Sequence, residues 1–227
     1  MKNVLMLLLM ISGLSFGQNL TSDSFNDIQG NDRSWQDMQI GTVFEEVPIE
    51  GTPYMEETYK IGIASVNGKK IRLLMRYDAY NDQIELIDRN QKSFNLLKKE
   101  HIDAEFEGKT YKAIPFLANG EKKLGYANPL NEGDVVLYFK PRKRFQQAEK
   151  PENGYDDYSP PQYAEDHTYL IQRKGGMAEE IRLAKGPFVR YLKDKAPEMR
   201  RFISEQELKM KTVEDAVKLV NYYNRLN

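Results

Sequence analysis

Apolar and polar residues alternate with a period close to two between residues 41 and 184, and turn signals interrupt the alternation every 8–12 residues. Successive side chains of a strand point to opposite faces, so this period is typical of β-strands that bury one face. The pattern predicts a mainly β fold of the α+β class. We expect an antiparallel β-meander, or a curved, barrel-like sheet, of about eight to ten strands.

The clearest predicted hairpin surrounds the dipeptide Asn67-Gly68. Asn-Gly supplies the two positive φ angles of a type I′ turn, so strands are predicted over residues 58–66 and 69–77. Alternation within the second strand assigns four side chains to the buried face: Ile71, Leu73, Met75 and Tyr77.

The same pattern continues toward the C-terminal end of the β region. Further strands are predicted over residues 83–88, 92–97, 109–116, 123–130, 135–145, 167–173 and 178–184. Residues 148–166 break the rhythm, because Pro, Gly and acidic residues dominate there. Loops longer than ~12–15 residues are often functional or disordered, so we expect a long exposed loop over 148–166.

Three helices are predicted after Gly186-Pro187, where apolar residues begin to recur at three- and four-residue spacing. They cover residues 187–193, a segment from Pro197 onward, and residues 212–226. Thr212 is a favourable N-cap, and Asp215 three residues later resembles a capping box. The apolar stripe of the last helix predicts that the segment 186–227 packs on the sheet.

The first residues show the charge and hydropathy pattern of a secretory signal peptide. Lys2 precedes an apolar run that is far shorter than the ~20 residues needed to span a bilayer. The small residues Ser15 and Gly17 precede a predicted cleavage site near Gln18. We therefore expect residues 1–17 to be removed and the protein to reach the periplasm or the extracellular space.

The predicted organisation has four parts along the chain. They are a signal peptide (1–17), a flexible polar lead-in (18–40), an antiparallel β domain (41–185) and a helical segment (186–227). No second segment approaches the length of a membrane span, so none is expected.

Composition narrows the classes of function. The formal net charge of −1 argues against a dedicated nucleic-acid-binding protein, which usually carries a basic domain. The chain contains no cysteine, which excludes disulfides, thiolate metal sites, cysteine nucleophiles and a lipid-modified N-terminal cysteine. With 40% hydrophobic residues the composition is that of a folded chain that relies on its core for stability.

Two segments are candidates for contact with a partner. The first is a basic run near the end of the predicted strand 135–145, made of Lys140, Arg142, Lys143 and Arg144. It could meet anionic lipid, lipopolysaccharide or an acidic partner, or it could contact the protein's own acidic loop or serve solubility. The second is a set of loop tyrosines, Tyr155, Tyr158 and Tyr163. These could stack on sugars or anchor a protein surface, or they could fold back on the sheet.

No catalytic, cofactor or metal motif is evident, so none of these sites is predicted. Gly-x-Ser-x-Gly, Gly-x-Gly-x-x-Gly and Walker-type loops are absent from the sequence. The two histidines, His101 and His167, lack a recognisable third metal ligand. Asp78, Asn81 and Asp82 have oxygen ligands at short spacing, but Asn and Asp also favour turns, and a hairpin turn is the simpler interpretation.

Four short stretches carry a family resemblance. They are Ser-Phe-Gly-Gln at 15–18, Gly-Thr-Pro-Tyr at 51–54, Arg-Tyr-Asp-Ala-Tyr-Asn-Asp-Gln-Ile-Glu at 76–85 and Tyr-Tyr-Asn at 222–224. In these the chain resembles an uncharacterised family of exported proteins of the Bacteroidota. The resemblance implies a Gram-negative envelope setting and agrees with a meander followed by helices, but it implies no activity and no site residues.

The sequence therefore favours a non-enzymatic, exported cell-envelope protein that binds or scaffolds a partner, either another envelope protein or a glycan. The alternative is a carrier of a small apolar ligand or lipid in a β-barrel-like cavity, because curved meanders can enclose one. An unrecognised hydrolase ranks third. The oligomeric state stays open.

Overall fold

The computed structural model describes residues 48–88, 90–149 and 158–226. All of the described residues belong to one compact unit. The predicted signal peptide (1–17) and lead-in (18–40) therefore lie outside the described residues.

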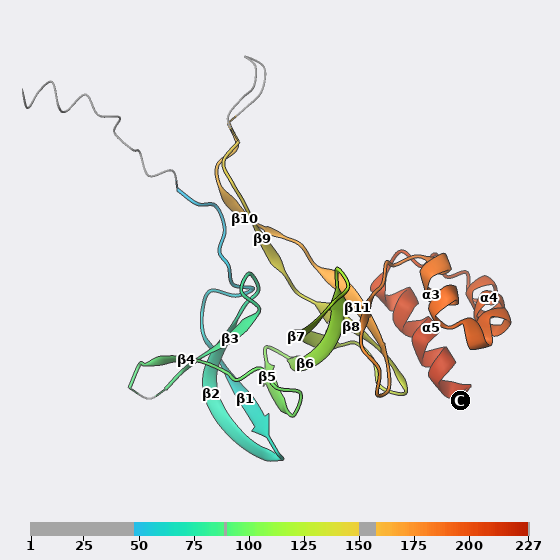
Figure 1. The fold of residues 1–227 in the computed structure, drawn as a ribbon, viewed down its shortest axis with the longest axis horizontal. Coiled ribbons are helices and arrows are strands. Elements are labelled where there is room, and N and C mark those ends of the chain that lie inside the picture. Colours follow the sequence, from blue (N-terminus) through green and yellow to red (C-terminus); the bar gives the residue numbers. More distant parts are fainter. Residues whose placement is uncertain (1–47, 89, 150–157, 227) are drawn as a thin grey trace, which may run out of the picture. The chain divides into compact units, whose positions relative to one another are not determined.

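Ten strands of the described chain form one antiparallel sheet (Figure 1). Its strands are β1 Lys60–Val66, β2 Lys69–Asp78, β3 Gln83–Ile87, β4 Ser93–Asn95, β5 Ile102–Phe106, β6 Lys109–Ala118, β7 Glu121–Pro129, β8 Val135–Lys140, β11 Thr168–Arg173 and β12 Glu179–Glu180. Their order across the sheet is β12-β11-β8-β7-β6-β5-β1-β2-β3-β4. The mainly β, curved-sheet prediction is thereby confirmed.

The sheet curls so that its β12 edge comes back against β6, a strand from the middle of the sheet. The backbone N–H of Ala178, just before β12, donates to the carbonyl of Pro115 in β6 at 2.9 Å, and the N–H of Leu117 donates to Ala178 at 3.0 Å. Through this isolated bridge, the β12 edge of the curled sheet meets β6. Strands β6, β7, β8 and β11 and the bridging Ala178 share one buried hydrophobic cluster: Ile114, Ala127, Tyr138, Leu170 and Ala178.

The C-terminal helices cover strands β8 and β11. They are α3 Lys185–Tyr191, α4 Ala196–Glu205 and α5 Val213–Arg225, with the short 3₁₀ turn η1 Lys193–Lys195 between α3 and α4. Val135, Leu137 and Ile171 of the sheet share one core with the helices' apolar side chains. Thr212 caps α5 by accepting from the N–H of Asp215, as the sequence predicts. The three predicted helices and their packing on the sheet are confirmed.

A second core lies at the β1–β3 end of the sheet and is rich in aromatic residues. Tyr111 stacks on Phe106 and contacts Tyr77, which meets Tyr126 edge to face. The predicted Asn67-Gly68 turn has the positive φ angles of type I′. One side chain differs from the predicted buried face: Ile71 is 51% exposed. It lies near the tip of the β1–β2 hairpin, opposite Ala64 of β1.

The predicted strand 135–145 is broken, and the predicted loop 148–166 is partly a strand. Pro141 lacks an N–H group and cannot continue a ladder, so β8 ends at Lys140. The chain then forms β9 (Lys143–Gln146), which pairs with β10 (Gln162–Glu165) in a separate two-stranded ribbon. β10 falls inside 148–166, where the sequence predicts a loop. The prediction of a loop is therefore wrong for residues 162–165.

Candidate functional site

A cleft of about 430 Å³ lies where Pro141 breaks the strand. We call it the basic cleft. The turn after β2, the β6–β7 hairpin and the segment from the end of β8 into β9 supply its lining: Ala79, Tyr80, Asp82, Phe116, Ala118, Asn119, Lys123, Lys140, Arg142, Lys143, Arg144 and Phe145. Five of these residues are cations, and Asp82 is the one acid among the described residues that line it.

Most of the cleft's cations have partners of their own. Arg142 pairs with Asp166 at 2.8 Å, and Lys143 Nζ donates to the carbonyl oxygen of Thr52 at 2.9 Å. Lys123 pairs with an exposed glutamate at 3.5 Å, a contact that solvent screens strongly. Arg144 is exposed and has no ion pair with any described residue. The positive charge at the rim is therefore only partly compensated, which favours an anionic ligand.

The floor of the cleft is a partly buried charge network centred on Asp82. Its Oδ2 lies 3.0 Å from Lys98 Nζ and 3.2 Å from Lys140 Nζ. Its Oδ1 accepts from the hydroxyl of Tyr77 at 2.7 Å and from the N–H of Tyr126 at 3.1 Å. Lys140 also donates to the carbonyl of Tyr126 at 3.2 Å. Burial lowers the pKa of Lys140, and the nearby Asp82 carboxylate opposes that shift.

Gly125 makes room for this network. A Cβ atom at this position would lie 2.6 Å from Lys140 Nζ and 2.8 Å from Asp82 Oδ2. The backbone of β7 therefore approaches the ion pair as closely as only glycine allows.

Three aromatic rings form one wall beside the cations. Tyr80, in the turn after β2, meets Tyr163 edge to face at 5.4 Å, and Tyr163 contacts Phe145 at 5.2 Å. Tyr163 and Phe145 lie opposite each other in the β9–β10 register. Tyr80, taken as a whole residue, remains 47% exposed. The wall thus ends in an aromatic surface that is open to solvent.

The basic run and the loop tyrosines predicted from the sequence come together at the cleft only in part. Arg142, Lys143 and Arg144 line the cleft, and Tyr163 supports its wall. Tyr158 is 46% exposed but does not line the cleft, and Tyr155 lies outside the described residues.

Lys140 differs most from its prediction as a partner-binding residue. It is only 4% exposed because its ammonium group is buried against Asp82. It therefore belongs to the floor of the cleft and is not part of the exposed basic patch. The prediction of self-contact holds for Arg142, whose partner Asp166 lies in the 148–166 segment.

Lys98, Lys123 and Tyr80 were not predicted as site residues, and Asp82 was interpreted only as part of a turn. The only signal was the cluster of Asn and Asp in the turn after β2. There Asp78 accepts hydrogen bonds from the backbone N–H groups of Tyr80 and Asn81, as expected of a turn. No group of three or more His, Asp or Glu side chains in the described part of the chain is placed to hold a metal ion.

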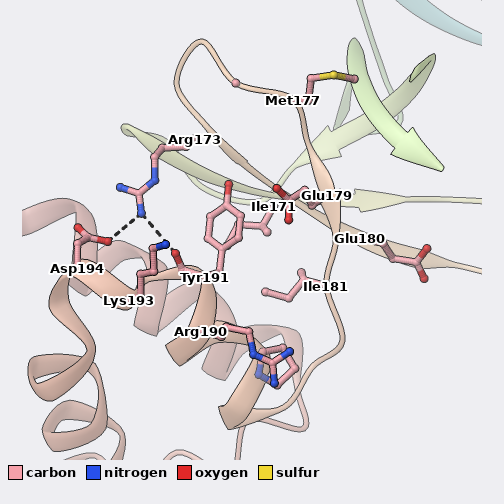
Figure 2. A pocket seen from close by; sticks show the side chains of 12 residues that line it. Ile171, Arg173, Met177, Glu179, Glu180, Ile181, Arg190, Tyr191, Lys193 and Asp194 are labelled. Atoms are coloured by element: carbon pink, nitrogen blue, oxygen red, sulfur yellow. Dashed lines mark hydrogen bonds and ion pairs between the residues drawn. The ribbon is translucent and has the colours of Figure 1, made fainter. Parts of the chain in front are cut away.

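A larger cleft of about 870 Å³ separates β11 and β12 from α3 and η1 (Figure 2). Arg173 points from β11 toward the helical segment, where it pairs with Asp194 at 3.0 Å and reaches the carbonyl of Tyr191 at 3.5 Å. Its guanidinium also donates to the hydroxyl of Tyr223, which in turn donates to Asp194. Arg173 already has these protein partners. We therefore interpret Arg173, Asp194 and Tyr223 as a structural cluster, called the fastening, that joins the sheet to the helices.

The described helices include none that combines the length and the apolar character needed to cross a membrane. Comparison of the chain with protein-family models, with curated proteins and with solved structures gives no match in any of the three. Function is therefore inferred from the geometry of the basic cleft and from the sequence.

Proposed function

We propose that this is a non-enzymatic, exported protein of the cell envelope that binds an anionic partner through the basic cleft. Export rests on the N-terminal pattern of charge and hydropathy. The partner's charge rests on a single observation, the five cations that line one cleft beside one acid. That acid, Asp82, is already neutralised by two lysines.

The two alternatives receive less support. A lipid carrier needs an apolar cavity, whereas the apolar side chains where the sheet curls toward β6 pack together in one buried cluster. A glycosidase-type hydrolase needs two carboxyl groups flanking the substrate, and the basic cleft supplies one that is held in ion pairs.

The test is calorimetric titration of the whole chain with a short acidic polymer such as tetraglutamate. We expect binding that weakens when salt rises from about 50 to about 300 mM, because screening shortens the reach of surface charges. Reversing the charge of two rim residues, Arg144→Glu with Lys123→Glu, should weaken binding by about tenfold or more.

Arg200→Glu with Arg201→Glu is the matched control, since it reverses two charges that are exposed on α4 and do not line the cleft. It should change the dissociation constant by no more than about twofold. Equal losses in the control and in the rim variant would assign any binding to net charge alone and contradict the proposal.

A further inference from the structure

The basic cleft has the size of a small-molecule site. Its volume of about 430 Å³ falls in the range of pockets that enclose ligands of drug size, ~300–1,000 Å³. A stable protein–protein contact buries a far larger surface, ~1,200–2,000 Å² in total. The cleft is therefore suited to one or two rings of a ligand and too small to be a protein interface by itself.

The lining combines two kinds of recognition. Arg144 and Arg142 both line the cleft, and a guanidinium binds a carboxylate or a phosphate through two parallel hydrogen bonds. Arg144 has no ion pair with a described residue, whereas Arg142 has a solvent-exposed pair with Asp166 that a ligand would have to share or displace. Tyr80 lines the same cleft and is an exposed residue, at 47%. An aromatic face offers an apolar surface, which the C–H groups on one face of a sugar ring can cover.

The exposed ring is also held in place. The ring of Tyr80 packs against Tyr163. Tyr163 in turn packs against Phe145, its partner in the β9–β10 pair. The backbone of Tyr80 is fixed by hydrogen bonds to Asp78 at 3.0 Å and to Pro53 at 3.3 Å. A ring positioned before binding loses little conformational freedom when a ligand stacks on it.

We infer that the ligand of the basic cleft is an acidic saccharide, whose sugar ring stacks on Tyr80 while its carboxylate or phosphate pairs with the rim arginines. This inference rests on the proposed function and narrows the anionic partner to one chemical class. A saccharide that carries uronic acids and one that carries phosphate share the required chemistry.

Calorimetry with four ligands tests the inference: tetragalacturonate, a mannose oligosaccharide with a terminal phosphate, neutral maltotetraose and tetraglutamate. At least one acidic saccharide should bind about tenfold more tightly than both maltotetraose and tetraglutamate. The tighter of the two acidic saccharides identifies the source of the charge.

Variants separate stacking from charge. Tyr80→Ala should weaken binding of the acidic saccharide by about fivefold or more and that of tetraglutamate by less than about twofold. Tyr80→Phe keeps the ring and should retain the affinity. Tyr158→Ala is the matched control, because Tyr158 has a similar exposure outside the cleft.

Failure of the saccharide inference and failure of the proposed anion site give different results. If tetraglutamate binds as tightly as the saccharides, or if Tyr80→Ala leaves saccharide binding unchanged, the inference is overturned and the proposed anion site stands. If none of the anions binds, or if the Arg144→Glu, Lys123→Glu variant binds them normally, both are overturned.

Discussion

Asp82 Oδ2 lies 3.2 Å from Lys140 Nζ, and this ion pair joins the turn after β2 to the last residue of β8. The lysine side chain is 5% exposed and the aspartate side chain 22%. Lys98 approaches the same oxygen at 3.0 Å. One carboxylate therefore compensates two ammonium groups, one of them almost fully removed from water.

The first prediction concerns this imbalance. Asp82→Asn preserves the shape of the side chain but leaves Lys140 buried without a counter-charge. Removing one partner of a buried pair usually costs about 3–5 kcal/mol, so we expect a loss of about 3 kcal/mol in the free energy of unfolding. Urea unfolding followed by circular dichroism measures it.

The double variant Asp82→Asn, Lys140→Met provides the control for that loss. It removes the buried charge together with its partner, and it should recover more than half of the lost stability. A double variant less stable than Asp82→Asn alone would mean that the lysine contributes through packing and not through the pair.

The sequence predicts the architecture well because alternation, turns and caps are local signals. Asn67-Gly68 specifies its turn, and Thr212 specifies the start of α5. The charge network was not predictable, because Asp82 and Lys140 meet only after the sheet curls. Lys140 lies in a basic run, and without knowledge of its partner Asp82 such a lysine is expected to be exposed.

The broken strand illustrates the same limit. Pro141 was visible in the sequence, yet the alternation of residues 135–145 continued across it. After Pro141 the chain leaves the large sheet, and β9 pairs with β10 instead. The residues of β10 come only after the 148–161 segment, so the pattern within 135–145 could not reveal this pairing. This pairing places Tyr163 against Phe145, which lines the cleft together with Arg144, and no local pattern specified it.

The second prediction concerns Gly125. A methyl group there would meet Lys140, Asp82 and Phe116 at 2.6, 2.8 and 2.8 Å. Overpacking a tight site typically costs about 1–3 kcal/mol, and we expect Gly125→Ala to lose that much stability in chemical unfolding.

Gly186→Ala is its control. Gly186 lies in α3, where an added Cβ meets nothing within 4 Å. Alanine favours helices over glycine, so this change should be neutral or stabilise the protein by up to about 0.5 kcal/mol. Similar losses at both positions would rule out the crowding of the ion pair as the cause.

The third prediction concerns alkaline pH. Burial raises the pKa of the phenols of Tyr77, Tyr111 and Tyr126 above the ordinary value of 10.0. A raised pKa contributes stability that is complete below about pH 10 and is lost as pH rises toward the folded-state value. We expect Tyr111→Phe to remove one such contribution and to flatten the decline of stability above about pH 10.

Urea unfolding at several pH values between about 8 and about 11.5 measures the slopes. The lowered pKa of Lys140 acts in the opposite direction, but it is present in both proteins and cancels in the comparison. Tyr158→Phe, at an exposed ring, should keep the slope of the unaltered protein. A Tyr111→Phe slope equal to that of Tyr158→Phe would contradict the prediction.

The last prediction concerns the fastening between sheet and helices. The buried hydroxyl of Tyr223 donates to Asp194 and accepts from Arg173, so Tyr223→Phe removes both hydrogen bonds. We expect a loss of about 1–2 kcal/mol near neutral pH. Tyr222→Phe is the control, because the Tyr222 ring stacks on Phe202 and its hydroxyl has no hydrogen bond with another described residue.

The pH dependence of that loss follows from Asp194. The hydrogen bond from Tyr223 holds the pKa of Asp194 below its ordinary value of 3.8. A lowered pKa contributes stability above the ordinary value, and this stability is lost as pH falls through the folded-state value. The difference between the Tyr223→Phe variant and the unaltered protein should therefore shrink between about pH 5 and about pH 2.5. A difference that stays constant over this range would show that the hydroxyl acts through Arg173 or packing and not through the Asp194 carboxylate.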